Sequence, residues 1–268
     1  MSYPFADRAA EDDRLVAQGR VFDPLTHRLL REAGLSRGMR VLDLGSGAGN
    51  VSRLAAEIVG PEGTVVGIER DPAAVELARR RTQAPNIEYR VGDVQTLDGV
   101  EDGFDAVVGR LILMYVTDPA AALRNAAARL RDNGLICIHE CDLVCLTAAP
   151  PTALFDRVHG YFLQALEKAG VELRMGPSLF SAFLSAGLPG PDLLVEAFAA
   201  GGSQAPTWAW ANVIAAAVPL MERLGVATRD EVGVETLSDR LLSETMASGS
   251  CVYGPPMTGA WVRLRAAQ

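Results

Sequence analysis

Residues 41–52 read Val-Leu-Asp-Leu-Gly-Ser-Gly-Ala-Gly-Asn-Val-Ser, a strand pattern that ends in three spaced glycines. A helical pattern follows from residue 51. Strand, glycine turn and helix are how an α/β protein brings bare backbone against a nucleotide-bearing ligand. The dinucleotide-binding fingerprint has glycines at its first, third and sixth positions. The sixth position here is Asn50, so this turn differs from that fingerprint.

Short apolar runs alternate with helical stretches on both sides of this turn. Near-continuous Val, Ile and Leu over such lengths suits strands that are buried on both faces of a parallel sheet. The pattern therefore predicts a doubly wound, seven-stranded, mostly parallel α/β sheet of Rossmann-like type. The expected strands are residues 40–44, 64–68, 87–91, 106–108, 135–139, 193–197 and 258–264.

Asp-Pro pairs at 23–24, 71–72 and 118–119 each predict the start of a helix. Asp caps the free amides there, and Pro is tolerated at the first helical position. The first pair is expected to break the helical stretch of residues 7–34. The other expected helices are residues 51–58, 73–81, 120–130, 152–169, 178–186, 207–224 and 229–247.

We expect a single domain over residues 1–268. The later helices are long enough to cover the active edge of the sheet as a lid. The expected segments are N-terminal helices at 1–36, a cofactor-binding core at 37–146, helical lid or substrate segments at 147–190 and 203–250, and the last strands at 191–200 and 256–266.

The composition narrows the class of protein. Apolar residues make up 49% of the chain, and the net charge is −8, which disfavours nucleic-acid and anionic membrane partners. The sequence contains no apolar run of membrane-spanning length and no signal-peptide layout, so we expect a cytoplasmic protein with reduced thiols. Cys137, Cys141 and Cys145 are evenly spaced, but they lack a paired Cys-x-x-Cys or His pattern, and no metal site is expected.

Polar residues end the predicted strands. Glu69 follows the second strand, about twenty residues after the glycines, which is the distance at which an acid meets ribose hydroxyls. Asp93 follows the third strand, Arg110 the fourth, and His139 with Glu140 the fifth. Ligands of open α/β sheets bind beyond the carboxyl ends of the strands, so these residues are candidates for one site.

These motifs together resemble those of class I S-adenosylmethionine-dependent methyltransferases. The chain more loosely looks like the small-molecule methyltransferases of bacterial secondary metabolism and quinone C-methylation. The resemblance covers about residues 40–140 and rests on Val41–Gly49, Val66–Glu69, Gly92–Val94 and Phe104–Val108. It implies the Rossmann-like methyltransferase fold with a helical lid. It also implies S-adenosylmethionine as cofactor and S-adenosylhomocysteine as product.

The resemblance also assigns roles at the strand ends. It implies that the glycine turn admits the methionine part of the cofactor and that Glu69 holds the ribose diol. It places Asp93 at the adenine amino group, Val94 against the ring, and Arg110 in the methyl-transfer channel. The predicted cofactor-binding residues are Tyr3, Gln18, Gly45, Ser46, Gly47, Asn50, Glu69, Arg70, Asp93, Val94 and Arg110.

The methyl acceptor is less well defined by the sequence. We favour Glu140 as base or substrate anchor, with His139 second, and for either residue a capping role is an equal alternative. Aromatic side chains suit a flat substrate, and Arg174 suits a substrate carboxylate. The predicted substrate residues are Met114, Tyr115, His159, Phe162, Arg174 and Trp208. No metal-ligating carboxylate cluster follows the fourth and fifth strands, so magnesium-dependent methylation is disfavoured.

Three functions remain open from the sequence. The leading one is methyl transfer to carbon, nitrogen or oxygen of a small aromatic or heteroaromatic metabolite in bacterial secondary metabolism, by a monomer or homodimer. The second is a cofactor-holding module or cyclase of the same fold that transfers no methyl group. The third is a nicotinamide oxidoreductase, which Asn50 disfavours.

Overall fold

The glycine turn joins β1 (Arg40–Leu44) to α2 (Asn50–Val59) in the computed structural model, which describes residues 8–264. Within the first helix, side chains are described at residue 14 and from residue 18 onward. Tyr3, one of the predicted cofactor-binding residues, lies outside the described residues. None of the helices in this part of the chain combines the length and the hydrophobicity needed to cross a bilayer.

The described chain divides into two compact units. The sheet unit comprises Phe22–Glu140, Met175–Val195 and the described residues from Thr258 onward. The helical unit comprises the helix up to Val21, together with Cys141–Arg174 and Glu196–Met257.

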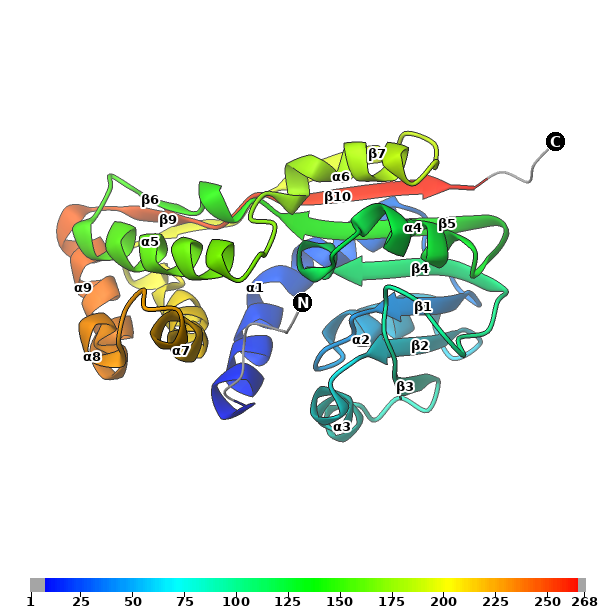
Figure 1. Ribbon diagram of the computed structural model, residues 1–268, viewed down its shortest axis with the longest axis horizontal. Coiled ribbons are helices and arrows are strands. Elements are labelled where there is room, and N and C mark those ends of the chain that lie inside the picture. Colours follow the sequence, from blue (N-terminus) through cyan, green and yellow to red (C-terminus); the bar gives the residue numbers. More distant parts are fainter. Residues whose placement is uncertain (1–7, 265–268) are drawn as a thin grey trace. The chain divides into compact units, whose positions relative to one another are not determined.

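A seven-stranded sheet with the order β3-β2-β1-β4-β5-β10-β7 organises the sheet unit. The pairs β3–β2, β2–β1, β1–β4 and β4–β5 are parallel, and β10 runs in the opposite direction to β4 (Figure 1). The predicted fold class is therefore confirmed. The strands are β1, β2 (Thr64–Glu69), β3 (Ile87–Val91), β4 (Phe104–Arg110), β5 (Leu130–Cys141), β7 (Asp192–Glu196) and β10 (Met257–Arg263).

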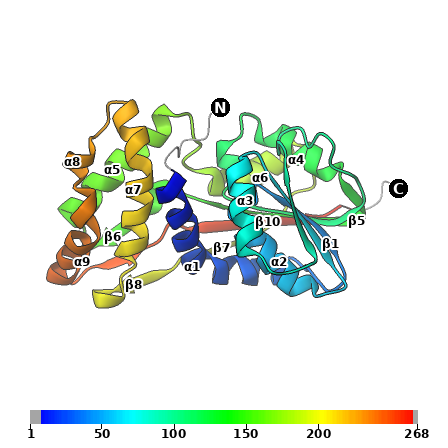
Figure 2. The ribbon, with the colours of Figure 1, turned by 90° about the horizontal axis from the view of Figure 1, so that it is seen from below.

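Helices cover both faces of this sheet, with α1 and α2 on one side and α4 and α6 on the other (Figure 2). One face buries Val41 of β1 and Val108 of β4 against Leu29 of α1 and Ala55 of α2. Strands that consist almost entirely of Val, Ile and Leu are buried on both faces, and a helical layer on each side of the sheet provides that burial. The helices are α1 (Arg8–Glu32), α2, α3 (Pro72–Arg81), α4 (Pro119–Ala127) and α6 (Met175–Ser185).

The first helix is continuous, and the predicted break at Asp23-Pro24 is wrong. Pro24 lies inside α1, where a proline costs about 3 kcal/mol because it removes a backbone hydrogen bond. Arg110 donates to Asp23 at 2.9 Å and to the Thr26 hydroxyl at 2.8 Å, on either side of this proline. These tertiary bonds, together with buried Leu25 and Leu29, hold the helix across Pro24.

The helical unit contains a small sheet that the sequence analysis did not predict. Its strands are β6 (Thr147–Ala149), β9 (Cys251–Tyr253) and β8 (Ala199–Gly201), paired antiparallel in that order. Its helices are α5 (Ala153–Lys168), α7 (Thr207–Arg223), α8 (Arg229–Val232) and α9 (Leu237–Ser248). The single helix expected over 229–247 is divided, because Gly233 adopts a left-handed conformation with φ of 64°.

Candidate active site

The glycine turn is held open by backbone conformations that favour glycine. Gly45, Gly47 and Gly49 have φ values of 67°, 49° and 80°, in the left-handed region. The amides of Gly45 and Ser46 both donate to the Ile68 carbonyl, at 2.9 and 3.0 Å. The turn after β1 is therefore fixed against the end of β2.

Glu69 ties the same turn to the residues after β2. One carboxylate oxygen accepts from the Gly47 amide at 3.1 Å, and the other accepts from the Asp71 amide at 3.0 Å. The Ser46 side chain is buried beside them, and its hydroxyl has no hydrogen-bond partner among the described residues. A buried hydroxyl without a partner costs free energy, so this position fits a polar ligand group.

The third strand end lies next to Glu69. The Gly92 amide donates to the Glu69 carbonyl at 3.0 Å, which brings the ends of β2 and β3 together. Asp93 is exposed, and one of its oxygens accepts from the Gln95 amide at 2.8 Å. Val94 is buried. The structure therefore groups Ser46, Glu69 and Asp93 at the carboxyl ends of the first three strands.

Asn50, another predicted cofactor residue, already has hydrogen-bond partners in this chain. The Asn50 side-chain oxygen accepts from Arg53 at 2.6 Å and from Arg81 at 3.1 Å. These bonds tie the first turn of α2 to Arg81 of α3 through the Asn50 side-chain oxygen. Arg70 is exposed after β2, and Gln18 is half-buried in α1.

A buried polar network joins the ends of β4 and β5 to α1. The Thr26 hydroxyl lies 3.0 Å from the Phe22 carbonyl, accepts from Arg110, and lies 3.1 Å from His139 Nδ1. When its single proton goes to Phe22, the His139 Nδ1–H donates to Thr26 and Nε2 is left as the acceptor. Burial, aided by the positive charge of Arg110, lowers the pKa of His139 to about 3. His139 is therefore neutral at pH 7.

Glu140 is fully buried, and one carboxyl oxygen accepts from the backbone amides of Ile112 and Leu113, at 2.8 and 2.7 Å. Its second oxygen has no partner among the described residues. Burial raises the pKa of Glu140 to about 8, against the opposing effect of these amides. Glu140 is therefore protonated in most molecules at pH 7 and is a poor base there.

Asp43 is a buried acid at the end of β1 that the site prediction did not include. Burial raises its pKa to about 7, although the Ser52 hydroxyl donates to it at 2.5 Å. Its other oxygen has no partner among the described residues. The only sequence signal was its place inside the strand-to-glycine motif, where an acid among buried apolar residues is unusual.

The predicted substrate residues are divided between the two units. Met114 and Tyr115 belong to the short 3₁₀ helix η1 (Leu113–Tyr115) of the sheet unit. His159, Phe162, Arg174 and Trp208 belong to the helical unit.

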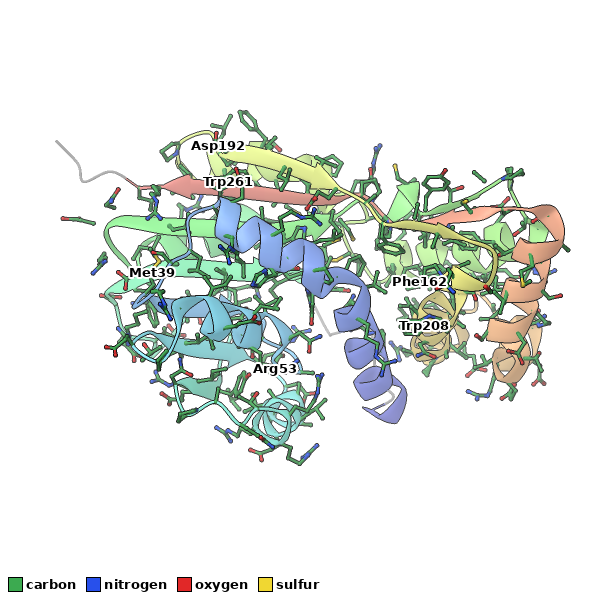
Figure 3. The ribbon with its side chains drawn as sticks, turned by 180° about the vertical axis from the view of Figure 1, so that it is seen from behind. Met39, Arg53, Phe162, Asp192, Trp208 and Trp261 are labelled. Atoms are coloured by element: carbon green, nitrogen blue, oxygen red, sulfur yellow. The ribbon has the colours of Figure 1, made fainter. Side chains whose placement is uncertain are left out.

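Four rings from α5 and α7 form an aromatic cluster in the helical unit. Trp210 makes edge contacts with His159 at 5.7 Å and with Phe162 at 5.1 Å between ring centroids, and it packs against Phe155 at 6.1 Å. Trp210 is only 8% exposed, whereas Trp208 is 38% exposed and lies 5.8 Å from the Arg20 guanidinium. Figure 3 labels Phe162 and Trp208 in this unit. Trp210, rather than Trp208, is thus the tryptophan that joins the predicted aromatic residues.

Arg174 binds a carboxylate of this chain. Its Nε and Nη2 atoms donate to the same oxygen of buried Asp142, at 3.1 and 2.9 Å. Asp142 also caps the Val144 amide at 3.2 Å. Arg174, which was predicted to bind a substrate carboxylate, is therefore paired with the carboxylate of Asp142. Among the described residues, no three His, Cys, Asp or Glu side chains come together as a metal site.

The chain is similar in sequence to known methyltransferases. Residues 35–168, half of the chain, match the family model described as a methyltransferase domain. The chain is 31% identical to an arsenite methyltransferase of Halobacterium salinarum over 40% of this chain and 28% of that protein. It is 30% identical to the ubiquinone/menaquinone biosynthesis C-methyltransferase UbiE of Coxiella burnetii, over 53% of this chain and 56% of that protein.

The fold is also found in a solved structure. The YcgJ protein from Bacillus subtilis is similar over 90% of this chain and 99% of that chain, with a TM-score of 0.54 and 16% identity. At that identity the likeness shows the fold alone. The chain spans less than two thirds of the length of the two curated relatives above. From the family match and the sheet topology, the chain belongs to the class I S-adenosylmethionine-dependent methyltransferase family, whose cofactor is S-adenosylmethionine.

Proposed function

We propose that this protein transfers a methyl group from S-adenosylmethionine to a small aromatic or heteroaromatic metabolite. The observation that carries the proposal is the glycine turn braced by Glu69, with the buried Ser46 hydroxyl left without a partner beside it. The cofactor supplies an electrophilic methyl group on a positively charged sulfur. The chain's own residues must bind it, orient it and exclude water.

The residues at the strand ends fit that cofactor. The left-handed turn leaves Gly45 and Gly47 only half-buried, and the Ser46 hydroxyl offers a hydrogen bond to the amino-acid part. The Glu69 carboxylate, which now accepts from two amides, has further lone pairs for the ribose hydroxyls. The exposed Asp93 carboxylate accepts from the Gln95 amide through one oxygen, so it can accept another hydrogen bond from an exocyclic amine.

Neither candidate base is suited to removing a proton at pH 7. Glu140 keeps its proton, because its pKa is about 8, and His139 with a pKa of about 3 binds a proton only weakly. We therefore propose that transfer depends on placement of an already nucleophilic atom. The name of the Coxiella relative, a C-methyltransferase, supports carbon as one such atom.

An aromatic acceptor is supported by the rings of the helical unit. His159, Phe162 and Trp210 pack edge to face, and the Trp210 indole N–H has no partner among the described residues. A flat ligand with a hydrogen-bond acceptor would match these groups. A cytoplasmic location, a role in secondary metabolism and the absence of nucleic-acid partners remain predictions, supported by the acidic composition and the family resemblance.

Calorimetric titration with S-adenosylmethionine tests the cofactor part of this proposal. Wild-type protein should bind it, and Glu69→Ala should weaken binding by at least tenfold. Glu62→Ala removes an exposed carboxylate shortly before β2 and should bind like the wild type. A folded wild type that binds no cofactor, or a Glu69→Ala variant that binds as well as wild type, would refute this part of the proposal.

Mass spectrometry of aromatic metabolites incubated with the protein and isotopically labelled cofactor tests the acceptor. Transfer of the label to an aromatic or heteroaromatic ring, or to its substituents, is the expected result. Cofactor binding without any labelled product would instead favour the cofactor-holding module of the same fold.

A further inference from the structure

The turn that follows β4 is fastened to the end of β5 by three consecutive amides. The Leu111 amide donates to the His139 carbonyl at 3.0 Å. The Ile112 and Leu113 amides donate to one oxygen of Glu140, at 2.8 and 2.7 Å. Leu111 has a φ of 52°, a conformation that a leucine adopts only when surrounding bonds impose it.

This turn places the Ile112 side chain directly against the glycine turn. A Cβ built on Gly45 would lie 2.5 Å from Ile112 Cδ1 and 2.8 Å from Cγ1. A Cβ on Gly109 would lie 3.1 Å from Ile112 Cγ2. The Ile112 side chain therefore fills the space beside Gly45 and Gly109, at the ends of β1 and β4. Gly45 therefore packs against Ile112, and its amide donates to the Ile68 carbonyl.

We propose that Glu140 is a positioning residue, which holds Ile112 against Gly45 and so fixes the glycine turn in its cofactor-binding conformation. This inference rests on the proposed function, because the turn is taken to bind S-adenosylmethionine. Glu140 acts through its accepting oxygen, so the role requires no proton transfer. An amide oxygen at the same place can accept the same two hydrogen bonds.

Two substitutions separate positioning from acid–base chemistry. Glu140→Gln retains an acceptor of equal reach, so its cofactor Kd and its kcat should stay within about threefold of wild type. Glu140→Met fills a similar volume but cannot accept from the two amides, so its cofactor Kd should rise at least tenfold. Its kcat at saturating cofactor should change much less than its KM.

A variant at Ile112 tests the same link between Glu140 and Gly45 without removing a buried carboxyl. Ile112→Ala should also raise the cofactor Kd, and the double variant with Glu140→Met should weaken binding by much less than the product of the two separate effects. Ile87→Ala shortens another half-buried isoleucine, at the amino end of β3, and should leave cofactor binding unchanged.

Amide hydrogen exchange of the ligand-free protein gives a readout that needs no cofactor. Glu140→Met should speed exchange at least tenfold at residues 45–46 and 111–113, and Glu140→Gln should not. The amides of residues 60, 62 and 63, which follow α2, should exchange alike in all variants. Unchanged exchange in Glu140→Met would overturn the link between the two turns, whether or not the wild type binds S-adenosylmethionine.

The kinetic outcomes are equally decisive. A wild-type Kd in Glu140→Met, or strictly multiplicative effects in the double variant, would overturn the positioning role. A loss of kcat above a hundredfold in Glu140→Gln would overturn it in favour of direct chemistry by the carboxyl. If the wild type fails to bind S-adenosylmethionine while the exchange results hold, the proposed function fails and the link between the turns stands.

Discussion

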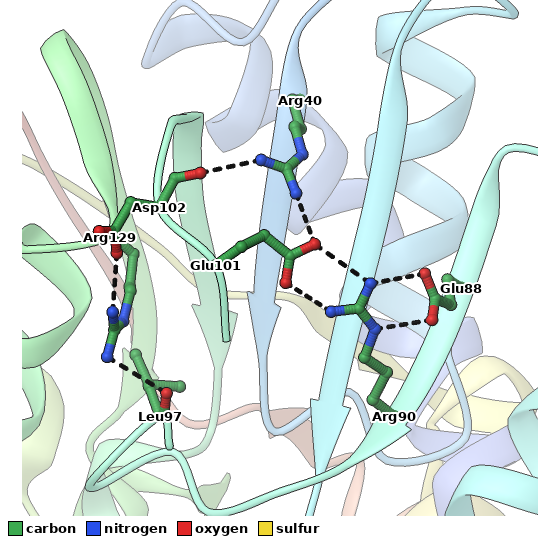
Figure 4. Close-up of polar contacts among 7 residues, drawn as sticks. All are labelled: Arg40, Glu88, Arg90, Leu97, Glu101, Asp102 and Arg129. Carbon is green, nitrogen blue, oxygen red and sulfur yellow. Dashed lines mark hydrogen bonds and ion pairs between the residues drawn. The ribbon is translucent and has the colours of Figure 1, made fainter. Parts of the chain in front are cut away.

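Acidic side chains in two regions of the main sheet have pKa values that are shifted in opposite directions. At the carboxyl ends of the strands, burial raises the pKa of Asp43 to about 7 and of Glu140 to about 8. Near the amino ends of β1, β4 and β5, an ion-pair cluster that extends to Arg90 of β3 includes Glu101, whose pKa is lowered to about 2, chiefly by hydrogen bonds from Arg90 (Figure 4). The residues of this cluster are Arg40, Glu88, Arg90, Glu101, Asp102 and Arg129.

The difference between these two groups of acids follows from their exposure to water. Glu101 and Arg90 stay in contact with water, so their charges persist but each pair contributes only a little. Asp43 is buried beside Ser52 of α2, and Glu140 is buried against the turn after β4. Each has one oxygen that lacks a partner among the described residues. Unpaired buried groups of this kind lower stability and are typical of functional sites.

The largest expected effect is the pH dependence that Asp43 imposes. Its raised pKa means that the folded state gives up its proton later than the unfolded state. The stability contribution is therefore complete below about pH 4 and is lost as the pH rises through about 7. Asp43→Asn should remove this dependence, which amounts to on the order of 4 kcal/mol for a shift of this size. Urea denaturation from pH 4 to pH 8 measures it, and parallel curves for the two proteins would contradict it.

Gly45→Ala should have the next largest effect. The new Cβ must displace Ile112, and φ of 67° is unfavourable for alanine, so we expect a loss of about 1–3 kcal/mol and weaker cofactor binding. Gly38→Ala is the matched control, because its φ is 79° but no atom lies within 4 Å of the added carbon. Thermal unfolding of both should show the greater loss for Gly45→Ala. Equal losses would mean that the contact with Ile112 is unimportant.

Thr26→Val tests the network that joins α1 to the ends of β4 and β5. Thr26 and Thr245 are both buried, and both donate to a carbonyl one helical turn earlier. Only Thr26 also contacts Arg110 and His139. Its substitution should therefore cost about 1–2 kcal/mol more than Thr245→Val in urea denaturation, because it leaves buried polar groups without a partner. A smaller cost for Thr26→Val would show that other contacts hold α1.

Glu101→Gln should have the smallest effect. Exposed ion pairs contribute about 0.2–1 kcal/mol, and salt screens them, so the loss should shrink in 1 M NaCl. The sign of its pH dependence is opposite to that of Asp43. A lowered pKa gives stability that is present above about pH 4.5 and is lost as the pH falls towards 2. A loss that is large, or unaffected by salt, would break the contrast between the two ends.

Local signals explain most of what could be predicted. Short apolar runs placed all seven strands of the main sheet, although β5 begins at Leu130 rather than at residue 135. The capping pairs Asp71-Pro72 and Asp118-Pro119 begin α3 and α4 as expected. The same dipeptide misled at Asp23-Pro24, because Arg110, which is distant in sequence, stabilises the helix there. The small sheet β6-β9-β8 was missed for a different reason: its strands have only three residues each, too few to show a sequence pattern.

The sequence by itself determined the glycine turn, the order of polar residues at the strand ends and hence the family. Those features depend on backbone conformation and on neighbours within a few residues, which the chain specifies locally. Only the tertiary structure decided that Asp43 and Glu140 are buried and that their pKa values are raised. Their state depends on burial, and the partners of Glu140 lie 27 and 28 residues away, brought within reach by the pairing of β4 with β5.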